Sequence, residues 1–268
     1  MANHGLAAVE AALRARKLDR TLTAALPSLE RVEPSAAATA VECLDACLRG
    51  GLPRGQLSEI AGPRSSGRTM LLLQLLAAAT RRGEITAVVD TFDCLDIESV
   101  VSAGVELERL LWIPGSPGSC PTASSLDRAI ERALKALNLV LQAGGFGVVA
   151  IDLADAPLSV LSRIPFTTWL RIQRTIEGSE TVCVLLGPQP LARSAGGLTL
   201  SLAGCPRWDA GANRSRRLGG IDVAVRVVSP RRRLDGEVTI AAVSAGDGPQ
   251  RQRDGSQSVP PRLRGLSQ

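Results

Sequence analysis

The chain has 268 residues, of which 45% are hydrophobic but only 2% aromatic, so a core must be filled by aliphatic side chains, as is usual for strands buried beneath helices. A net charge of +5 favours polyanionic partners only modestly, and six cysteines without a CxxC pair argue against a zinc site. No apolar run reaches the roughly 18 residues of a membrane span, and the charged first segment is unlike a signal peptide, so we expect a soluble, cytoplasmic protein with no membrane partner.

The first predicted element is an amphipathic helix over residues 7–26, because apolar residues recur there at helical spacing and basic residues cluster in its middle. The helix could pack on the core of its own chain or on a neighbouring subunit, and the sequence leaves both open. A linker over residues 27–38 leads to a second helix over residues 41–49.

Strands and helices alternate from there to about residue 186. The predicted strands cover residues 56–61, 85–90, 110–113, 148–153 and 181–186, and the predicted helices cover residues 69–82, 95–103, 124–143 and 167–177. Such alternation predicts an α/β fold with a mostly parallel sheet between helices.

After residue 196 the pattern changes. Strands are predicted over residues 198–202, 221–228 and 237–243 with no helix between them, which indicates antiparallel edge strands. The end of the chain is rich in Gly, Pro, Gln, Ser and Arg and is predicted to be disordered. We therefore expect an N-terminal helix and linker (1–34), one P-loop domain (35–245) and a disordered tail (246–268).

The segment after the first of the alternating strands predicts a phosphate-binding loop. It reads Gly62, Pro63, Arg64, Ser65, Ser66, Gly67, Arg68 and Thr69, which matches G-x-x-x-x-G-K-[ST] except that Arg68 replaces the lysine. The two glycines permit a tight turn whose N–H groups face phosphate oxygens, and the positive end of the next helix adds to this. We predict that all eight residues bind a nucleotide, with the Thr69 hydroxyl on Mg²⁺. The alternative is a strand-to-helix turn that binds nothing.

Asp152 is the second predicted metal ligand. It ends the apolar run of residues 148–151, at the place where an aspartate holds the Mg²⁺ shell in P-loop enzymes. The alternative is a residue that caps the next helix. Because a phosphate loop stands upstream, the metal role is favoured.

The motifs around this loop resemble those of the bacterial RecA recombinases. The stretch from Gly50 to Gly55 reads GGLPRG and the stretch from Glu59 to Thr69 reads EIAGPRSSGRT, which are similar to the GGLPxG lead-in and the GPESSGKT loop of RecA. The resemblance continues less specifically through Asp90 to about residue 245. It implies a RecA-like P-loop core, ATP with Mg²⁺ as cofactor, contact with single-stranded DNA and assembly into homo-oligomers.

Three departures from RecA bear on activity. Phe92 stands where RecA carries its catalytic glutamate, and a phenyl ring cannot polarise the attacking water. The loop over residues 190–195 is shorter than the DNA-gripping loop of a recombinase, and we expect no counterpart of the RecA C-terminal domain. Hydrolysis should be severely weakened, so we name no catalytic residue and leave open whether the chain is an enzyme.

Together these departures resemble the ImuA branch of the superfamily, whose members are RecA-like accessory proteins of SOS-induced mutagenesis. Residues 110–112 and 144–147 fit that branch as well. Membership implies a binding role beside RecA, an inactive Y-family polymerase homologue (ImuB) and an error-prone polymerase, with association with the nucleoid left open. The alternative is a working DNA-dependent ATPase of the recombinase class. A small-molecule P-loop kinase is disfavoured by the RecA-like motifs.

A basic loop lies among the late strands. Arg214, Arg216 and Arg217 flank a Gly/Asn-rich segment and could follow a phosphate backbone. No aromatic residue is interleaved with them in sequence, which argues against base stacking, and Trp208 has no role assigned from the sequence.

Overall fold

The computed structural model describes residues 35–115, 123–192, 197–210, 216–228, 236–243 and 264–265. The helix predicted over residues 7–26 lies outside these residues. So does the predicted disordered tail, apart from two residues near its end that form a short strand. The predictions for these two regions therefore stay predictions.

The described residues form one large sheet and one small one. Nine of the described strands form a single sheet in the order β11 (Arg264–Gly265), β10 (Gly236–Val243), β9 (Arg216–Val228), β8 (Thr199–Ala210), β3 (Gln56–Ala61), β7 (Val182–Gly187), β6 (Phe146–Asp152), β4 (Ile85–Asp90) and β5 (Leu110–Pro114). The strands from β8 to β5 run parallel, whereas β8, β9, β10 and β11 pair antiparallel. Two short strands, β1 (Ala36–Ala37) and β2 (Leu52–Pro53), pair separately.

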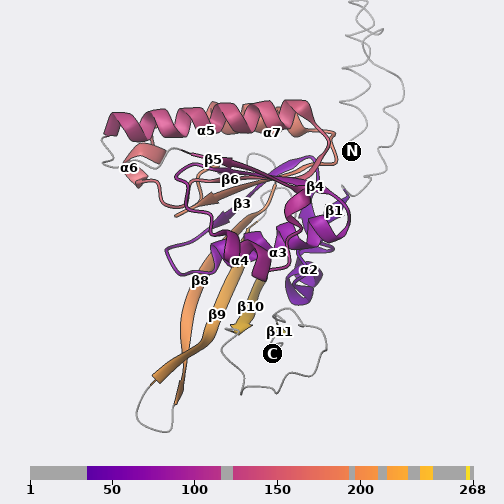
Figure 1. Cartoon of the computed structure of the whole chain (residues 1–268), viewed down its shortest axis with the longest axis vertical. Helices are drawn as coiled ribbons and strands as arrows, with labels where there is room; N and C mark the ends of the chain where they lie inside the picture. The colour runs from indigo at the N-terminus through magenta and orange to yellow at the C-terminus, as the bar shows by residue number, and fades with distance from the viewer. Residues whose placement is uncertain are drawn as a thin grey trace, which may run out of the picture. The chain divides into compact units, whose positions relative to one another are not determined.

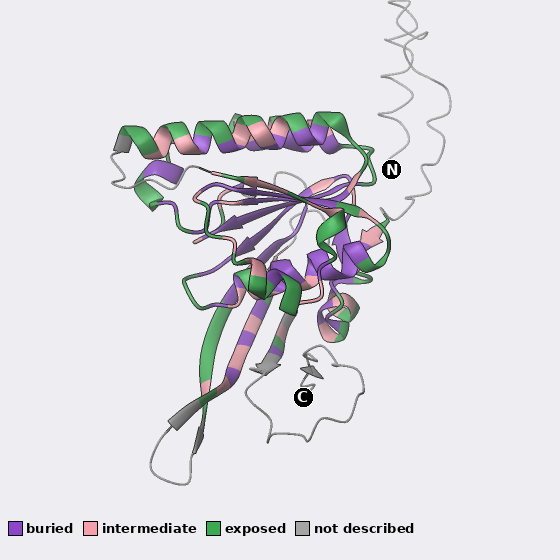
Figure 2. Ribbon diagram, viewed as in Figure 1, coloured by how far each residue is buried: buried purple, intermediate pink, exposed green. Residues whose placement is uncertain are grey.

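Helices cover both faces of the parallel strands (Figure 1). One face carries α2 (Glu42–Leu48), α3 (Arg68–Arg81) and α4 (Ile97–Ser102), and the other carries α5 (Ala123–Ala143), α6 (Leu158–Leu161) and α7 (Phe166–Ile176). Successive side chains of a strand point to opposite faces, so Val148 and Ala150 belong to the first core while Val149 and Ile151 belong to the second. Figure 2 shows the buried strands between helices whose outer surfaces are exposed.

This architecture confirms the predicted α/β class, the mostly parallel sheet and the antiparallel strands near the C-terminus. The strands of the second half extend beyond their predicted ends, because the apolar pattern stops before the backbone pairing of β8 and β9 does. The short helix α6 was not predicted, since its four residues are too few to show a helical period. Among the described residues, no helix combines the length and apolar character needed to cross a membrane.

The carboxyl ends of four parallel strands meet at one edge of the sheet. Ala61, the last residue of β3, lies opposite Gly187 at the end of β7. Asp152 at the end of β6 lies between Asp90 of β4 and Leu186 of β7. In open α/β sheets this edge is where ligands bind, so the fold brings the predicted phosphate loop and the predicted metal ligand to the expected place.

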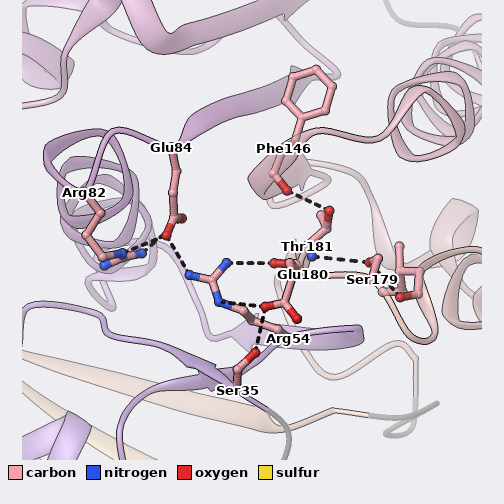
Figure 3. Close-up of polar contacts among 9 residues, drawn as sticks. Ser35, Arg54, Arg82, Glu84, Phe146, Ser179, Glu180 and Thr181 are labelled. Atoms are coloured by element: carbon pink, nitrogen blue, oxygen red, sulfur yellow. Dashed lines mark hydrogen bonds and ion pairs between the residues drawn. The ribbon is translucent and has the colours of Figure 1, made fainter.

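The opposite edge is fixed by ion pairs around Arg54, which belongs to the glycine-rich motif before β3 (Figure 3). Its guanidinium lies 2.6 Å from Glu84 Oε1 and donates to the main-chain oxygen of Glu180 at 2.7 Å. Arg82 also binds Glu84 at 2.9 Å, and the Ser35 hydroxyl donates to Glu180. The motif before the phosphate loop therefore joins the starts of three strands and lies far from the site.

Candidate nucleotide site

The predicted phosphate loop connects β3 to α3 and requires glycine at both of its ends. Gly67 has a φ of 90°, which favours glycine, and a Cβ there would approach the Val223 side chain of β9 to 2.8 Å. A Cβ at Gly62 would lie 2.5 Å from the main-chain oxygen of Leu202. The loop is therefore packed directly beneath β8 and β9, and side chains at these two positions would displace it.

The loop and the start of α3 fit a phosphate group. The N-cap residue Gly67 has no side chain to bond the first N–H groups of α3, and the first turn of this helix carries no acidic residue. The Ser66 hydroxyl is buried and has no hydrogen-bond partner, and Thr69 is exposed. Unbonded donors at a helix N-terminus attract anions, so the donor set here suits phosphate oxygens.

Arg68 differs from a phosphate-binding lysine because its side chain bonds the protein. It is only 7% exposed, and its Nη1 atom donates to the main-chain oxygens of Gly187 at 3.1 Å and Ala154 at 3.4 Å. Burial lowers the pKa of this guanidinium, against the attraction of Asp152 and Asp155. The cation at the lysine position thus links α3 to the ends of β6 and β7.

Asp152 stands at the predicted end of its strand and is half-buried. Its Oδ1 accepts a 2.8 Å hydrogen bond from the N–H of Ala154, which forms a local turn. It is not a helix cap, because α6 begins later, after Pro157. Burial raises the pKa of Asp152 to about 6, and the neighbouring charge of Asp90 adds to this effect.

Asp90 organises the turn that follows β4. Its carboxylate is buried and accepts hydrogen bonds from the N–H groups of Cys94 at 3.0 Å and Leu95 at 2.8 Å, and from the Trp112 indole at 3.3 Å. Phe92, within this turn, packs against the core beneath α5. At the position where the resemblance to RecA implies a glutamate, this chain therefore has a side chain that packs against the core.

Glu59 holds the segment between β7 and β8, and sequence reasoning assigned it no role. This carboxylate of β3 is 2% exposed and accepts the N–H groups of Leu191 and Ala192, both at 2.6 Å, and the Thr199 hydroxyl at 3.0 Å. A charged residue inside a buried strand whose other residues carry no charge was the one signal that could have indicated such an anchor.

The structure thus gathers the predicted residues at one edge of the sheet but assigns them different surroundings. Gly62 to Gly67 form one loop, Arg68 and Thr69 begin α3, and Arg68 meets Ala154, the residue whose N–H binds Asp152. Arg64 is exposed and forms an ion pair with Asp155 at 2.9 Å. Within the described residues, no group of three or more His, Cys, Asp or Glu side chains is arranged to hold a metal ion.

A family model for the RecA N-terminal domain matches residues 16–160, which is more than half of the chain and includes the whole phosphate loop and Asp152. The chain belongs to the RecA family. This confirms the resemblance drawn from the motifs around the loop, at the level of the family.

Individual RecA proteins match over 128 to 209 residues. The chain is 30% identical to Protein RecA of Chlorobium chlorochromatii over 151 residues, which are 51% of this chain and 39% of that protein. It is 36% identical to Protein RecA of Clavibacter michiganensis over 128 residues, 47% of this chain and 32% of that protein. Protein RecA 2 of Myxococcus xanthus is 28% identical over 209 residues, 69% and 53% of the two chains. The match thus spans about a third to a half of each of these RecA proteins.

Proposed function

We propose that this RecA-family chain is an accessory protein of DNA repair, related to the ImuA branch, that binds ATP weakly and hydrolyses it poorly or not at all. The observation that carries the proposal is the bonding of Arg68 to the carbonyls of Gly187 and Ala154. A guanidinium held by protein oxygens cannot at the same time follow a phosphate through the transition state.

The nucleotide would lie on the loop from Gly62 to Thr69. Its phosphate oxygens would accept from the loop N–H groups, and the free Ser66 hydroxyl would add a donor. Mg²⁺ would neutralise phosphate charge, with Thr69 and Asp152 as its ligands. The turn after β4 offers Phe92 where an activating carboxylate would be needed, so binding without turnover is the expected behaviour.

The partners in this proposal are RecA, an ImuB-like inactive polymerase homologue and an error-prone polymerase, in the SOS response and translesion synthesis. Family membership supports a role in DNA repair, and homo-oligomers and single-stranded DNA remain further partners. The partner role is tested with purified RecA and an ImuB-type homologue from the same organism. Binding to either one in the micromolar range or tighter supports the accessory role, and absence of binding to both contradicts it.

The nucleotide part is tested by Mg·ATP calorimetry with hydrolysis followed in parallel. We expect weak binding and no turnover, and Arg68→Lys should tighten binding because an ammonium can leave the two carbonyls more easily. The matched control is Arg109→Lys, whose side chain is about half exposed and pairs with Glu106 outside the loop, and which should leave binding unchanged.

The second candidate is a DNA-dependent ATPase of the recombinase class. The uncapped start of α3 and the free Ser66 hydroxyl favour it, because they are the features of a working phosphate site. Turnover by the unaltered protein that rises with single-stranded DNA would establish this function and overturn the accessory reading. If the accessory reading holds, Arg68→Lys together with Phe92→Glu should gain turnover.

A further inference from the structure

A groove lies between the first half of α5 and the junction of α6 with α7 (Figure 1). Its volume is about 400 Å³, which falls in the range of roughly 300–1,000 Å³ that ligand sites occupy. The three helices cover the face of the sheet that is opposite to α3. The groove is therefore separate from the predicted phosphate loop, which leads into α3 on the other face.

The floor of the groove is apolar. Ile130 of α5 and Val160 of α6 are buried and belong to the core beneath α5. Leu134 and Ile164 also line the groove and pack against this core, but they are only partly buried. Phe166, the first residue of α7, adds an apolar side chain that is 44% exposed. An occupant must therefore bring apolar groups of its own, because these are the groups that gain free energy when they leave water here.

The charged residues that line the groove do not balance. Asp127 and Glu131 lie four residues apart on α5, and therefore on one side of the helix. Nη2 of Arg163 lies 2.9 Å from Oδ1 of Asp127, so these two charges form an ion pair. Glu131 is exposed and has no ion pair within the described part of the chain. Arg128 and Lys135 are also exposed on α5, but they do not line the groove. The groove thus carries one carboxylate in excess.

We propose that this groove binds an amphipathic helix of a partner protein, with apolar side chains on its floor and a basic side chain at Glu131. Such helices place apolar residues one turn apart into a groove, and the open apolar surface here includes residues from both walls. The net charge of +5 opposes a basic partner over the molecule as a whole, so the excess carboxylate gives the groove its own charge preference. The inference goes beyond the proposed function, because it assigns a docking surface whatever the phosphate loop binds.

The test is the fluorescence anisotropy of two labelled peptides of about 15 residues, the length at which an isolated helix begins to form. The basic peptide has leucines at i, i+4 and i+7, a single arginine beside them, and alanine and glutamine elsewhere. The acidic peptide has glutamate in place of the arginine. We expect the full chain to prefer the basic peptide. Glu131→Lys should weaken that peptide by roughly three- to tenfold and strengthen the acidic one, because an ion pair is replaced by two like charges.

Two further variants separate the charge from the apolar floor. The matched control is Glu108→Lys, the same change at an exposed glutamate outside the groove, and it should leave both affinities unchanged. Leu134→Ala removes apolar surface from the floor and should weaken both peptides alike. Thermal unfolding shows whether the variants are folded, and if Leu134→Ala is not, the exchange of preference in Glu131→Lys decides, because that residue is exposed.

Equal affinity of the unaltered protein for the two peptides, or no effect of Glu131→Lys, overturns the proposal. So does an absence of binding, which is also the result if another part of this chain or a second copy already covers the groove. Displacement of the basic peptide by hexylamine at the same concentration indicates a site for small amines and overturns it as well. Mg·ATP binding should be equal in all variants, so failure here leaves the proposed function untouched.

Discussion

Nη1 of Arg68 lies 3.1 Å from the main-chain oxygen of Gly187, a residue 119 positions away in sequence. The contact joins the first residue of α3 to the last residue of β7 across the edge of the sheet where a phosphate would bind. In this chain the lysine position of the phosphate loop has become a structural link.

Removal of this link should destabilise the fold. In Arg68→Ala the carbonyls of Ala154 and Gly187 lose the guanidinium donor, although that of Gly187 keeps the N–H of Gly62, and the loss should cost about 1–3 kcal/mol of unfolding free energy. Arg64→Ala, four residues earlier in the loop, removes only an exposed ion pair and should change stability by about 0.5 kcal/mol or less. Urea unfolding of both variants measures the difference, and equal midpoints would show that the Arg68 contacts do not stabilise the native state.

The stability of the protein should depend on the charge of Asp152. Burial raises the pKa of this carboxyl from 3.8 to about 6, so the folded state binds its proton more tightly than the unfolded state does. The contribution of the group is therefore most favourable below pH 4 and is lost as the pH rises through 6. Asp152→Asn removes the buried charge but keeps an oxygen for the Ala154 N–H, and it should stabilise the protein by roughly 2–3 kcal/mol above pH 7.

The check is unfolding of both proteins in metal-free buffer from pH 4 to pH 8. The advantage of Asp152→Asn should shrink toward zero near pH 4. If the asparagine variant is less stable than the unaltered protein at every pH, then interactions of the Asp152 carboxylate in the folded state offset the cost of burying its charge.

Glu59→Ala should cost more than most core substitutions. It leaves the N–H groups of Leu191 and Ala192 and the Thr199 hydroxyl without their acceptor, and three lost hydrogen bonds to a buried carboxylate amount to about 3–5 kcal/mol. Glu59→Gln keeps one acceptor oxygen and should lose less. Hydrogen exchange should quicken first at Leu191 and Ala192, and uniform exchange throughout the domain would contradict a local anchoring role.

Arg54→Ala should loosen the opposite edge of the sheet. The guanidinium is 13% exposed and binds both Glu84 and the main chain at Glu180, so its removal should cost about 2–3 kcal/mol. The control is Arg109→Ala, whose ion pair with Glu106 is about half exposed. Because this edge is far from the phosphate loop, Mg·ATP affinity should be the same in both variants, and a selective loss in Arg54→Ala would place the motif in the nucleotide site.

Local pattern alone predicted most of the architecture. The run from Val148 to Asp152 is apolar until its last residue, which marks both a buried strand and the end of that strand. The spacing of Gly62 and Gly67 indicated the loop, because only glycine tolerates its turn and its approach to β9. The limits of β8 and β9 were underestimated, since strands that leave the sheet no longer show one buried face.

The sequence by itself determined the fold class, the glycine turn between β3 and α3 and the position of Asp152 at a strand end, because strand and helix periods and glycine turns are properties of neighbouring residues. Only the tertiary structure decided that Arg68 bonds Gly187, that Glu59 anchors the segment after β7, and that Trp208 faces Leu218. Each of these contacts joins residues from different strands. Which residues meet in such contacts depends on how the strands pair and how closely the helices pack on the sheet. Strand pairing and packing in turn depend on residues from all parts of the chain, not on neighbouring residues alone.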